Sequence, residues 1–188
     1  MIPEGDGSMA VIIPPTEEHI LLRKINNVFS KLWEFQKVDV ILKSQDYSDI
    51  DDFIDSYFEI LVNELLSYDE DYTHRNVRRA WNELPDYEQL CLLLEIFGYE
   101  DEWEFLEVNF DFLKDHFRET IESIHWVVFM PWEYHPREEA EGIVKEMLAD
   151  PAKEWIIEKY KLDRNIDVEK LSDEELEYLH FLLNGVIY

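Results

Sequence analysis

Residues 99–130 read YEDEWEFLEVNFDFLKDHFRETIESIHWVVFM. If this segment is helical, each residue turns by about 100°, and the large apolar side chains then gather within one arc of about 80°. Pro131 follows the segment and cannot continue a helix. The pattern therefore predicts one long amphipathic helix that packs against a core. Its core candidates are Trp103, Leu106, Phe110, Leu113, Phe117, Ile121 and Ile124.

The same segment carries a row of carboxylates on another face of the predicted helix. Residues spaced by three or four positions are neighbours at about 5–6 Å on a helix surface. At a rise of 1.5 Å per residue, a continuous helix would carry this row for about 33 Å. Mutual repulsion weakens an isolated helix of this kind, but burial of the apolar face is the larger effect. The row consists of Glu100, Glu104, Glu107, Asp111, Asp115, Glu119 and Glu122.

Apolar positions at helical spacing, together with capping residues and prolines, predict the remaining helices. Four of these helices are predicted before the long one: Thr16–Phe35, Ser48–Leu65, His74–Leu84 and Asp86–Phe97, the last of them ended by Gly98. Two follow it, one from about Pro136 that ends before Asp150 and one from about Pro151. The last begins at a capping box formed by Ser172 and Glu175 and ends at Asn184. The sequence also allows short strands at 10–13, 38–42, 126–130 and 185–188.

The expected architecture is a mainly α, single-domain bundle of about seven or eight helices with a few short strands. Residues 1–15 are expected to form an irregular leader, and residues 16–188 the single helical domain. We find no internal repeat, linker or low-complexity run that divides the chain.

Charge restricts the classes of partner. The 188 residues include 44 Asp and Glu against 17 Lys and Arg, which gives a net charge of −27. Residues 45–150 hold 29 of the acids and only 7 of the bases. Such a surface repels nucleic acids and anionic membranes, so neither is expected to bind directly. A basic protein is the natural partner.

Other features narrow the class of protein further. A single cysteine, Cys91, excludes an internal disulfide framework and a Cys-rich zinc site. The longest apolar stretch, Trp126 to Trp132, is far shorter than the roughly 20 residues that span a bilayer. The N-terminus lacks the basic start and apolar region of a secretory signal. We therefore expect a soluble, cytoplasmic protein.

The acidic row suggests a function, because a line of carboxylates resembles the line of phosphates on a nucleic acid. We predict a non-enzymatic protein-interaction module without a cofactor. It would bind the basic surface of a nucleic-acid-binding protein, as a DNA mimic or as an immunity-type antagonist. The alternative is that the acids are only the solvated face of a helix. The predicted contact residues are the seven of the row together with a second row that includes Asp51, Asp52, Asp55 and Glu59.

Two other functions are open. The pairs Glu122/His125 and Glu177/His180 have the Glu-x-x-His spacing of carboxylate-bridged di-iron bundles, which would indicate a metal-dependent helical enzyme. A structural subunit could instead dock through the aromatic group at Trp126, Phe129, Trp132 and Tyr134. The chain has no His-Glu-x-x-His motif, Gly-rich phosphate loop or Gly-x-Ser-x-Gly motif, so an enzyme is not the preferred interpretation.

Two smaller features have structural interpretations. Cys91 lies in the apolar run Leu90 to Leu94 and is expected to be a buried, inert thiol. Arg75, Arg78 and Arg79 form the one basic cluster, and we expect them to pair with the surrounding carboxylates.

Overall fold

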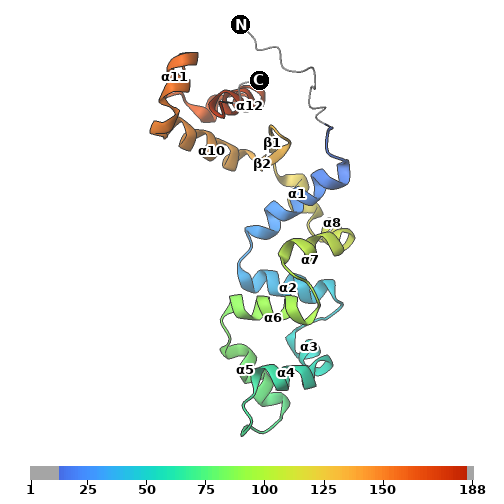
Figure 1. Cartoon of the computed structure of the whole chain (residues 1–188). Helices are drawn as coiled ribbons and strands as arrows, with labels where there is room; N and C mark the ends of the chain where they lie inside the picture. The colour runs from blue at the N-terminus through green and yellow to red at the C-terminus, as the bar shows by residue number, and fades with distance from the viewer. Residues whose placement is uncertain (1–12, 186–188) are drawn as a thin grey trace, which may run out of the picture. The chain divides into compact units, whose positions relative to one another are not determined.

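Helices account for most of the residues in the computed structural model, which describes residues 13–185 (Figure 1). That part of the chain contains 12 α-helices and one two-stranded antiparallel sheet, which confirms the predicted mainly α class. It forms two compact units: a central unit, Lys24–Ser123, and a terminal unit made of residues 13–23 and 124–185. The boundaries 16–188 of a single domain stay a prediction. The strands considered at 10–13 and 185–188 lie almost wholly outside the described residues.

The central unit is built from helices whose starts are fixed by side-chain caps. Asp49 accepts a hydrogen bond from Asp52 N at 2.9 Å, and Thr73 accepts one from Asn76 N at 3.2 Å. Ser48, the predicted cap, lies one residue before the observed one. The helices are α1 (Glu17–Ser30, in this unit from Lys24 onward), α2 (Glu34–Ser44), α3 (Ile50–Ser56), α4 (Phe58–Leu65), α5 (His74–Glu83), α6 (Asp86–Ile96), α7 (Glu102–Val108), α8 (Phe110–His116) and α9 (Arg118–Ser123).

The predicted continuous helix over 99–130 is wrong. It is divided at Asn109 and Phe117, whose ψ angles of 24° and 8° depart from the helical value near −42°. At the first break Asn109 Nδ2 donates to Phe105 O and Tyr99 Oη, both at 2.9 Å, and these bonds hold the side chain in place. The division lets α7, α8 and α9 each bury their own apolar residues, such as Phe105 and Leu113.

The predicted strand at 38–42 is also wrong. These residues belong to α2, where Val38, Val40, Ile41 and Leu42 are buried. Their alternating, β-branched pattern suits a strand, but burial on nearly all sides of a central helix selects the same residue types. The helix that was predicted to reach Phe35 ends at Ser30.

The central unit contains two copies of one motif, residues 25–65 and 77–117, related by an offset of 52 positions. In the second copy α6, α7 and α8 correspond to α2, α3 and α4. The backbone details correspond as well: Asp46 and Gly98 both have positive φ, at 64° and 82°. The predicted absence of a repeat is therefore wrong. Identical residues at equivalent positions are Leu32/Leu84, Leu42/Leu94, Tyr47/Tyr99, Asp49/Asp101, Phe53/Phe105, Phe58/Phe110 and Leu61/Leu113.

The two copies contact each other reciprocally. The Phe29 ring lies 5.8 Å from the Phe105 ring, while the equivalent pair, Trp81 and Phe53, lies 5.7 Å apart. The equivalent helices α2 and α6 pack along each other between these two contacts (Figure 1). The central unit therefore has approximate two-fold symmetry, in which each copy covers an aromatic ring of the other.

Gln45 and Phe97 are equivalent residues that differ in chemistry. Gln45 Nε2 donates to Tyr99 Oη and Asn109 Oδ1, both at 3.2 Å. At the equivalent position of the second copy, Phe97 instead packs against the rings of Tyr47 and Tyr57, with centroids 6.1 and 5.6 Å away. One copy therefore has a polar cluster where the other has an aromatic one.

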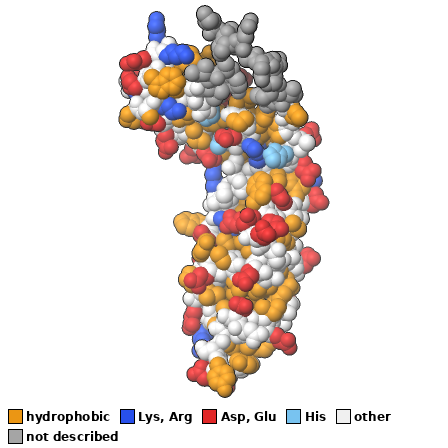
Figure 2. All heavy atoms as spheres, in the orientation of Figure 1, with side chains coloured by type: hydrophobic (Ala, Val, Ile, Leu, Met, Phe, Trp, Pro, Cys, Tyr) orange, Lys and Arg blue, Asp and Glu red, His pale blue; other side chains and the backbone are white. Residues whose placement is uncertain are grey.

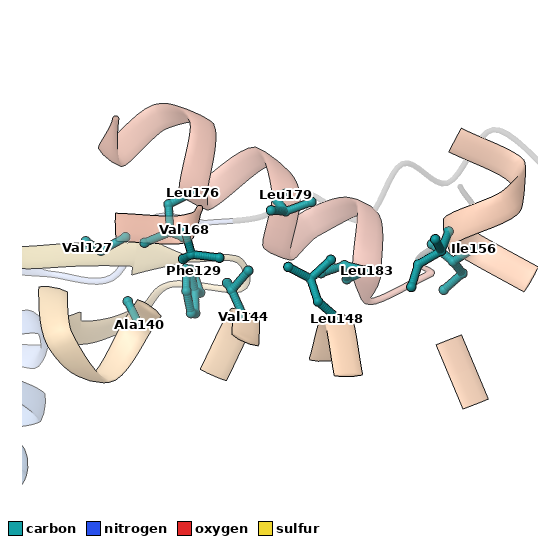
Figure 3. Packing of buried hydrophobic residues seen from close by; sticks show 11 residues of the cluster. Val127, Phe129, Ala140, Val144, Leu148, Ile156, Val168, Leu176, Leu179 and Leu183 are labelled. Atoms are coloured by element: carbon teal, nitrogen blue, oxygen red, sulfur yellow. The ribbon is translucent and has the colours of Figure 1, made fainter. Parts of the chain in front are cut away.

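The terminal unit encloses a second apolar core between a hairpin and its helices (Figure 3). In the hairpin, Val127 pairs with His135 and Phe129 pairs with Glu133, which confirms the strand predicted at 126–130. The capping box of Ser172 and Glu175 is also confirmed. The elements are β1 (Trp126–Phe129), β2 (Glu133–Pro136), α10 (Arg137–Ala149), the 3-10 turn η1 (Pro151–Lys153), α11 (Glu154–Tyr160), the 3-10 turn η2 (Val168–Lys170) and α12 (Asp173–Leu183).

Arg137 joins the helices of the terminal unit. Its guanidinium donates to the Glu141 and Asp173 carboxylates, at 2.7 Å each, and to Leu171 O at 2.7 Å. These bonds raise the pKa of Arg137, chiefly through Glu141, so its charge is permanent. A further contact to Val168 O at 3.3 Å completes the set. The side chain therefore connects α10 to η2 and to the start of α12.

His180 is buried in the terminal unit. Its ring stacks on Phe129 with centroids 3.7 Å apart and planes 5° from parallel, and Asn184 Nδ2 lies 3.3 Å from its Nδ1. Burial lowers the pKa of His180, and the nearby His135 acts in the same direction. The imidazole is therefore neutral in the folded protein at neutral pH.

Acidification is expected to destabilise the protein through His180. The unfolded chain binds a proton at His180 near its ordinary pKa of about 6.5, whereas the folded chain does so only at lower pH. The stability contributed by the neutral ring is full above that value and is lost as pH falls toward the folded pKa. Urea unfolding should show a lower midpoint at pH of about 5.5 than at about 7.5. His180→Leu should reduce this difference, whereas His19→Gln, at an exposed site, should leave it unchanged.

Candidate protein-interaction surface

The seven acids of the predicted row occupy several elements rather than one. Glu100 precedes α7, while the others lie in pairs: Glu104 and Glu107 on α7, Asp111 and Asp115 on α8, and Glu119 and Glu122 on α9. A straight row of about 33 Å is therefore wrong, because helical spacing does not hold across the two breaks. Six of the seven are exposed, and Glu104 is half-buried. Figure 2 shows acidic side chains in separate patches rather than in one line.

The second predicted row lies on the first copy, where Asp51, Asp55 and Glu59 are exposed. Two of these acids contact α5: Asp51 Oδ1 lies 2.8 Å from Arg78 Nη1, and Asp55 Oδ1 lies 2.8 Å from His74 Nε2. Arg79 similarly pairs with Glu70 at 2.9 Å. The expected pairing of the basic cluster with carboxylates is confirmed for Arg78 and Arg79. Asp51 of α3 thus faces a cation of its own chain.

On the second copy the ion pairs involve other acids than Glu107 and Asp111, since Glu102 of α7 pairs with Lys37 at 3.1 Å. Asp115 pairs with Arg118, and Glu107 accepts a hydrogen bond from the Trp103 indole. Within the described part of the chain, Glu107 and Asp111 have no Lys, Arg or His at ion-pair distance. His116 adds no charge at neutral pH, because partial burial and the neighbouring Lys43 lower its pKa. Uncompensated negative charge therefore remains on α7 and α8.

Trp103 lies on the surface among these acids. It was expected in the core, but α7 buries Phe105 and Leu106, and the Trp103 side chain is 36% exposed. Val108 on the same helix is 66% exposed. Alignment of the two copies carries a signal for this position, because Trp103 is equivalent to Asp51, a surface residue. An exposed indole beside carboxylates is typical of a protein-binding surface.

Cys91 is exposed, which corrects the expectation of a buried thiol. Helix α6 buries Leu90, Leu93 and Leu94, and these leave Cys91 on the solvent side. The equivalent residue of the first copy, Asp39, is also exposed. The apolar run Leu90 to Leu94 therefore reflects burial of one side of α6, and Cys91 lies on the other side.

Three of the four Glu-x-x-His residues make structural contacts. His125 Nε2 lies 2.6 Å from Asp173 Oδ2, and Glu177 Oε1 accepts a hydrogen bond from Val128 N at 3.2 Å. His180 is the ring stacked on Phe129. In residues 13–185 no group of three or more His, Cys, Asp or Glu side chains is arranged to hold a metal ion.

None of the helices in residues 13–185 combines the length and the apolar character needed to cross a bilayer.

Comparison with protein-family models, curated proteins and solved structures gives no match. The function must therefore be inferred from the surface chemistry of the chain.

Proposed function

We propose that the protein is an acidic protein-interaction module that binds the basic surface of a nucleic-acid-binding protein and thereby competes with nucleic acid. The observation that supports this proposal is the uncompensated, exposed charge at Glu107 and Asp111, together with Glu119 and Glu122. The central unit as a whole holds 25 Asp and Glu against 9 Lys and Arg.

The proposal does not depend on a straight helix. A basic surface that evolved to bind phosphates is attracted by any dense negative field, and the attraction guides association over about one Debye length, roughly 8 Å in physiological salt. Each exposed ion pair adds little on its own, so affinity has to come from several contacts at once. The acids of α7, α8 and α9 provide such a group.

Binding to a basic partner is expected to weaken at least about tenfold between about 50 and about 200 mM salt. The partner is to be captured from lysate of the native host at low salt, purified, and titrated with the full-length chain by calorimetry. Nucleic acid bound to that partner should be displaced by the chain. An affinity that does not change with salt, or displacement that does not occur, would contradict the proposal.

The variant Glu107→Lys/Asp111→Lys/Glu119→Lys is expected to abolish binding in the same titration. Its matched control changes the net charge equally but in the terminal unit, at exposed positions: Glu146→Lys/Glu158→Lys/Glu174→Lys. The control should retain most of the affinity. Circular dichroism checks that both variants remain folded. Equal loss of binding in both variants would show that only total charge matters.

A further inference from the structure

The two copies of the central unit allow one acidic helix to be compared with its equivalent. In the first copy, α3 faces α5, and Asp51 and Asp55 contact Arg78 and His74. The molecule thus shows one helix that packs against this type of surface: α5, which presents the Arg78 cation to Asp51 and the His74 ring to Asp55. The α5 sequence, HRNVRRAWNE, carries such cations on one side and buries Val77 and Trp81 on the other.

The equivalent surface of the second copy lacks the Arg78 cation. The α1 residue that corresponds to Arg78 is Asn26, which carries no charge. Glu107 occupies the position equivalent to Asp55, and Trp103 the position equivalent to Asp51. The second copy has therefore kept one acid of the pair, has replaced the other by an indole, and has no residue with the charge of Arg78 at the equivalent position. We call the surface formed by Glu100, Trp103, Glu107, Val108 and Asp111 the α7 face.

We propose that the α7 face is the docking site for a basic helical segment of the partner protein, with an arginine of that segment stacked on the Trp103 indole and paired with Glu107 or Asp111. This inference rests on the proposed function and specifies its contact. The argument combines charge complementarity with the ion pairs of the equivalent α3 surface. Arginine suits this position better than lysine, because its planar guanidinium stacks on an aromatic ring and forms two hydrogen bonds to a carboxylate.

Trp103 gives this site a specific contact in addition to its negative charge. Its Nε1 donates to Glu107, which holds the ring beside the carboxylate without burying it. Exposed tryptophans are frequent hot spots of interfaces, whereas exposed charges usually contribute to the rate of association. Val108 extends the apolar part of the face, and the equivalent residue in α3 is Ser56.

The test uses the full-length ¹⁵N-labelled chain and an alanine-based helical peptide in which arginine recurs at every fourth residue. In ¹H–¹⁵N spectra at low salt, the indole signal of Trp103, assigned with Trp103→Phe, and the α7 amides are expected to shift. The amides of α3 should not move, because Asp51 and Asp55 of that helix already contact side chains of α5. The lysine version of the peptide should bind more weakly.

The deciding variant is Trp103→Asp, which installs the residue that α3 has at the equivalent position and adds a negative charge. If the α7 face acts through the indole, the dissociation constant for the arginine peptide rises by about tenfold. If charge alone governs binding, the added carboxylate makes it fall. Tyr87→Asp, at an exposed tyrosine of α6, is the matched control and should not weaken binding.

The outcomes separate this inference from the proposed function. Tighter binding by Trp103→Asp, or shifts confined to other elements, would overturn the α7 face and leave the acidic module standing. A complete lack of peptide binding at low salt would overturn both.

Discussion

Replacing Phe53 or Phe105 with alanine is expected to lower the free energy of unfolding by about 3–5 kcal/mol in each case. Both side chains are fully buried, and each ring is covered by an aromatic residue of the other copy, Trp81 or Phe29. Truncation leaves a cavity that a close-packed core fills only in part. Urea unfolding followed by circular dichroism measures the change.

The repeat supplies the controls for this experiment. Phe35 and Tyr87 are also equivalent aromatic residues, but they are 57% and 65% exposed. Phe35→Ala and Tyr87→Ala should change stability by about 0.5 kcal/mol or less. A large loss for Phe53→Ala with almost none for Phe105→Ala would show that the two copies do not share one packing scheme.

The second large effect is expected for Arg137→Met, at about 2–3 kcal/mol. Methionine keeps the aliphatic stem but removes every donor, so the Glu141 and Asp173 carboxylates and the Leu171 carbonyl lose a partner. Removing one member of a largely buried network costs more than the pair contributes, because the remaining charges stay poorly solvated. Arg137→Lys should recover part of the loss, since an ammonium group can reach only some of the acceptors.

A second arginine, Arg118, serves as the control, and its replacement is expected to have little effect on stability. Arg118 pairs with Asp115 on the exposed surface of the central unit. Arg118→Met is therefore expected to leave the free energy of unfolding almost unchanged, as is usual for solvent-exposed ion pairs. Equal effects of the two substitutions would contradict the role assigned to Arg137 in joining α10 to η2 and α12.

Local signals in the sequence predicted the starts and ends of helices well. Gly98 has the positive φ of a helix-ending residue, and Ser172 and Glu175 form the predicted capping box. Such signals act within one turn of chain, so they survive whatever the tertiary fold is. The prediction of one helix over 99–130 is wrong because apolar periodicity continues across Asn109 and Phe117 and so does not mark the two breaks.

The repeat was missed because few residues are identical between the copies. What the copies share is a pattern of caps, buried positions and breaks, for example Asp49 with Asp101 and Tyr57 with Asn109, where the helices divide. Aligning the chain with itself at the offset of 52 would have revealed this pattern. It would also have placed Trp103 on the surface, opposite the sequence-based assignment to the core.

The candidate surface was predictable in composition but not in geometry. The acids at Glu107 and Asp111 are exposed, as expected for a solvated helix face. Their lack of compensation depends on which side chains the fold brings near them, and periodicity carries no information on that. The roles of Arg137 and His180 depend in the same way on residues far along the chain.

Because the copies pack reciprocally, one copy alone would lack part of its core. A polypeptide with only one copy would leave the face of its Phe53 or Phe105 ring open to water, because the covering residue comes from the other copy. A second molecule like itself could close that face. The central unit is thus equivalent to a symmetric homodimer whose subunits have been fused. In a homodimer every mutation changes both subunits, whereas in the fused chain a mutation changes one copy and the two copies can diverge.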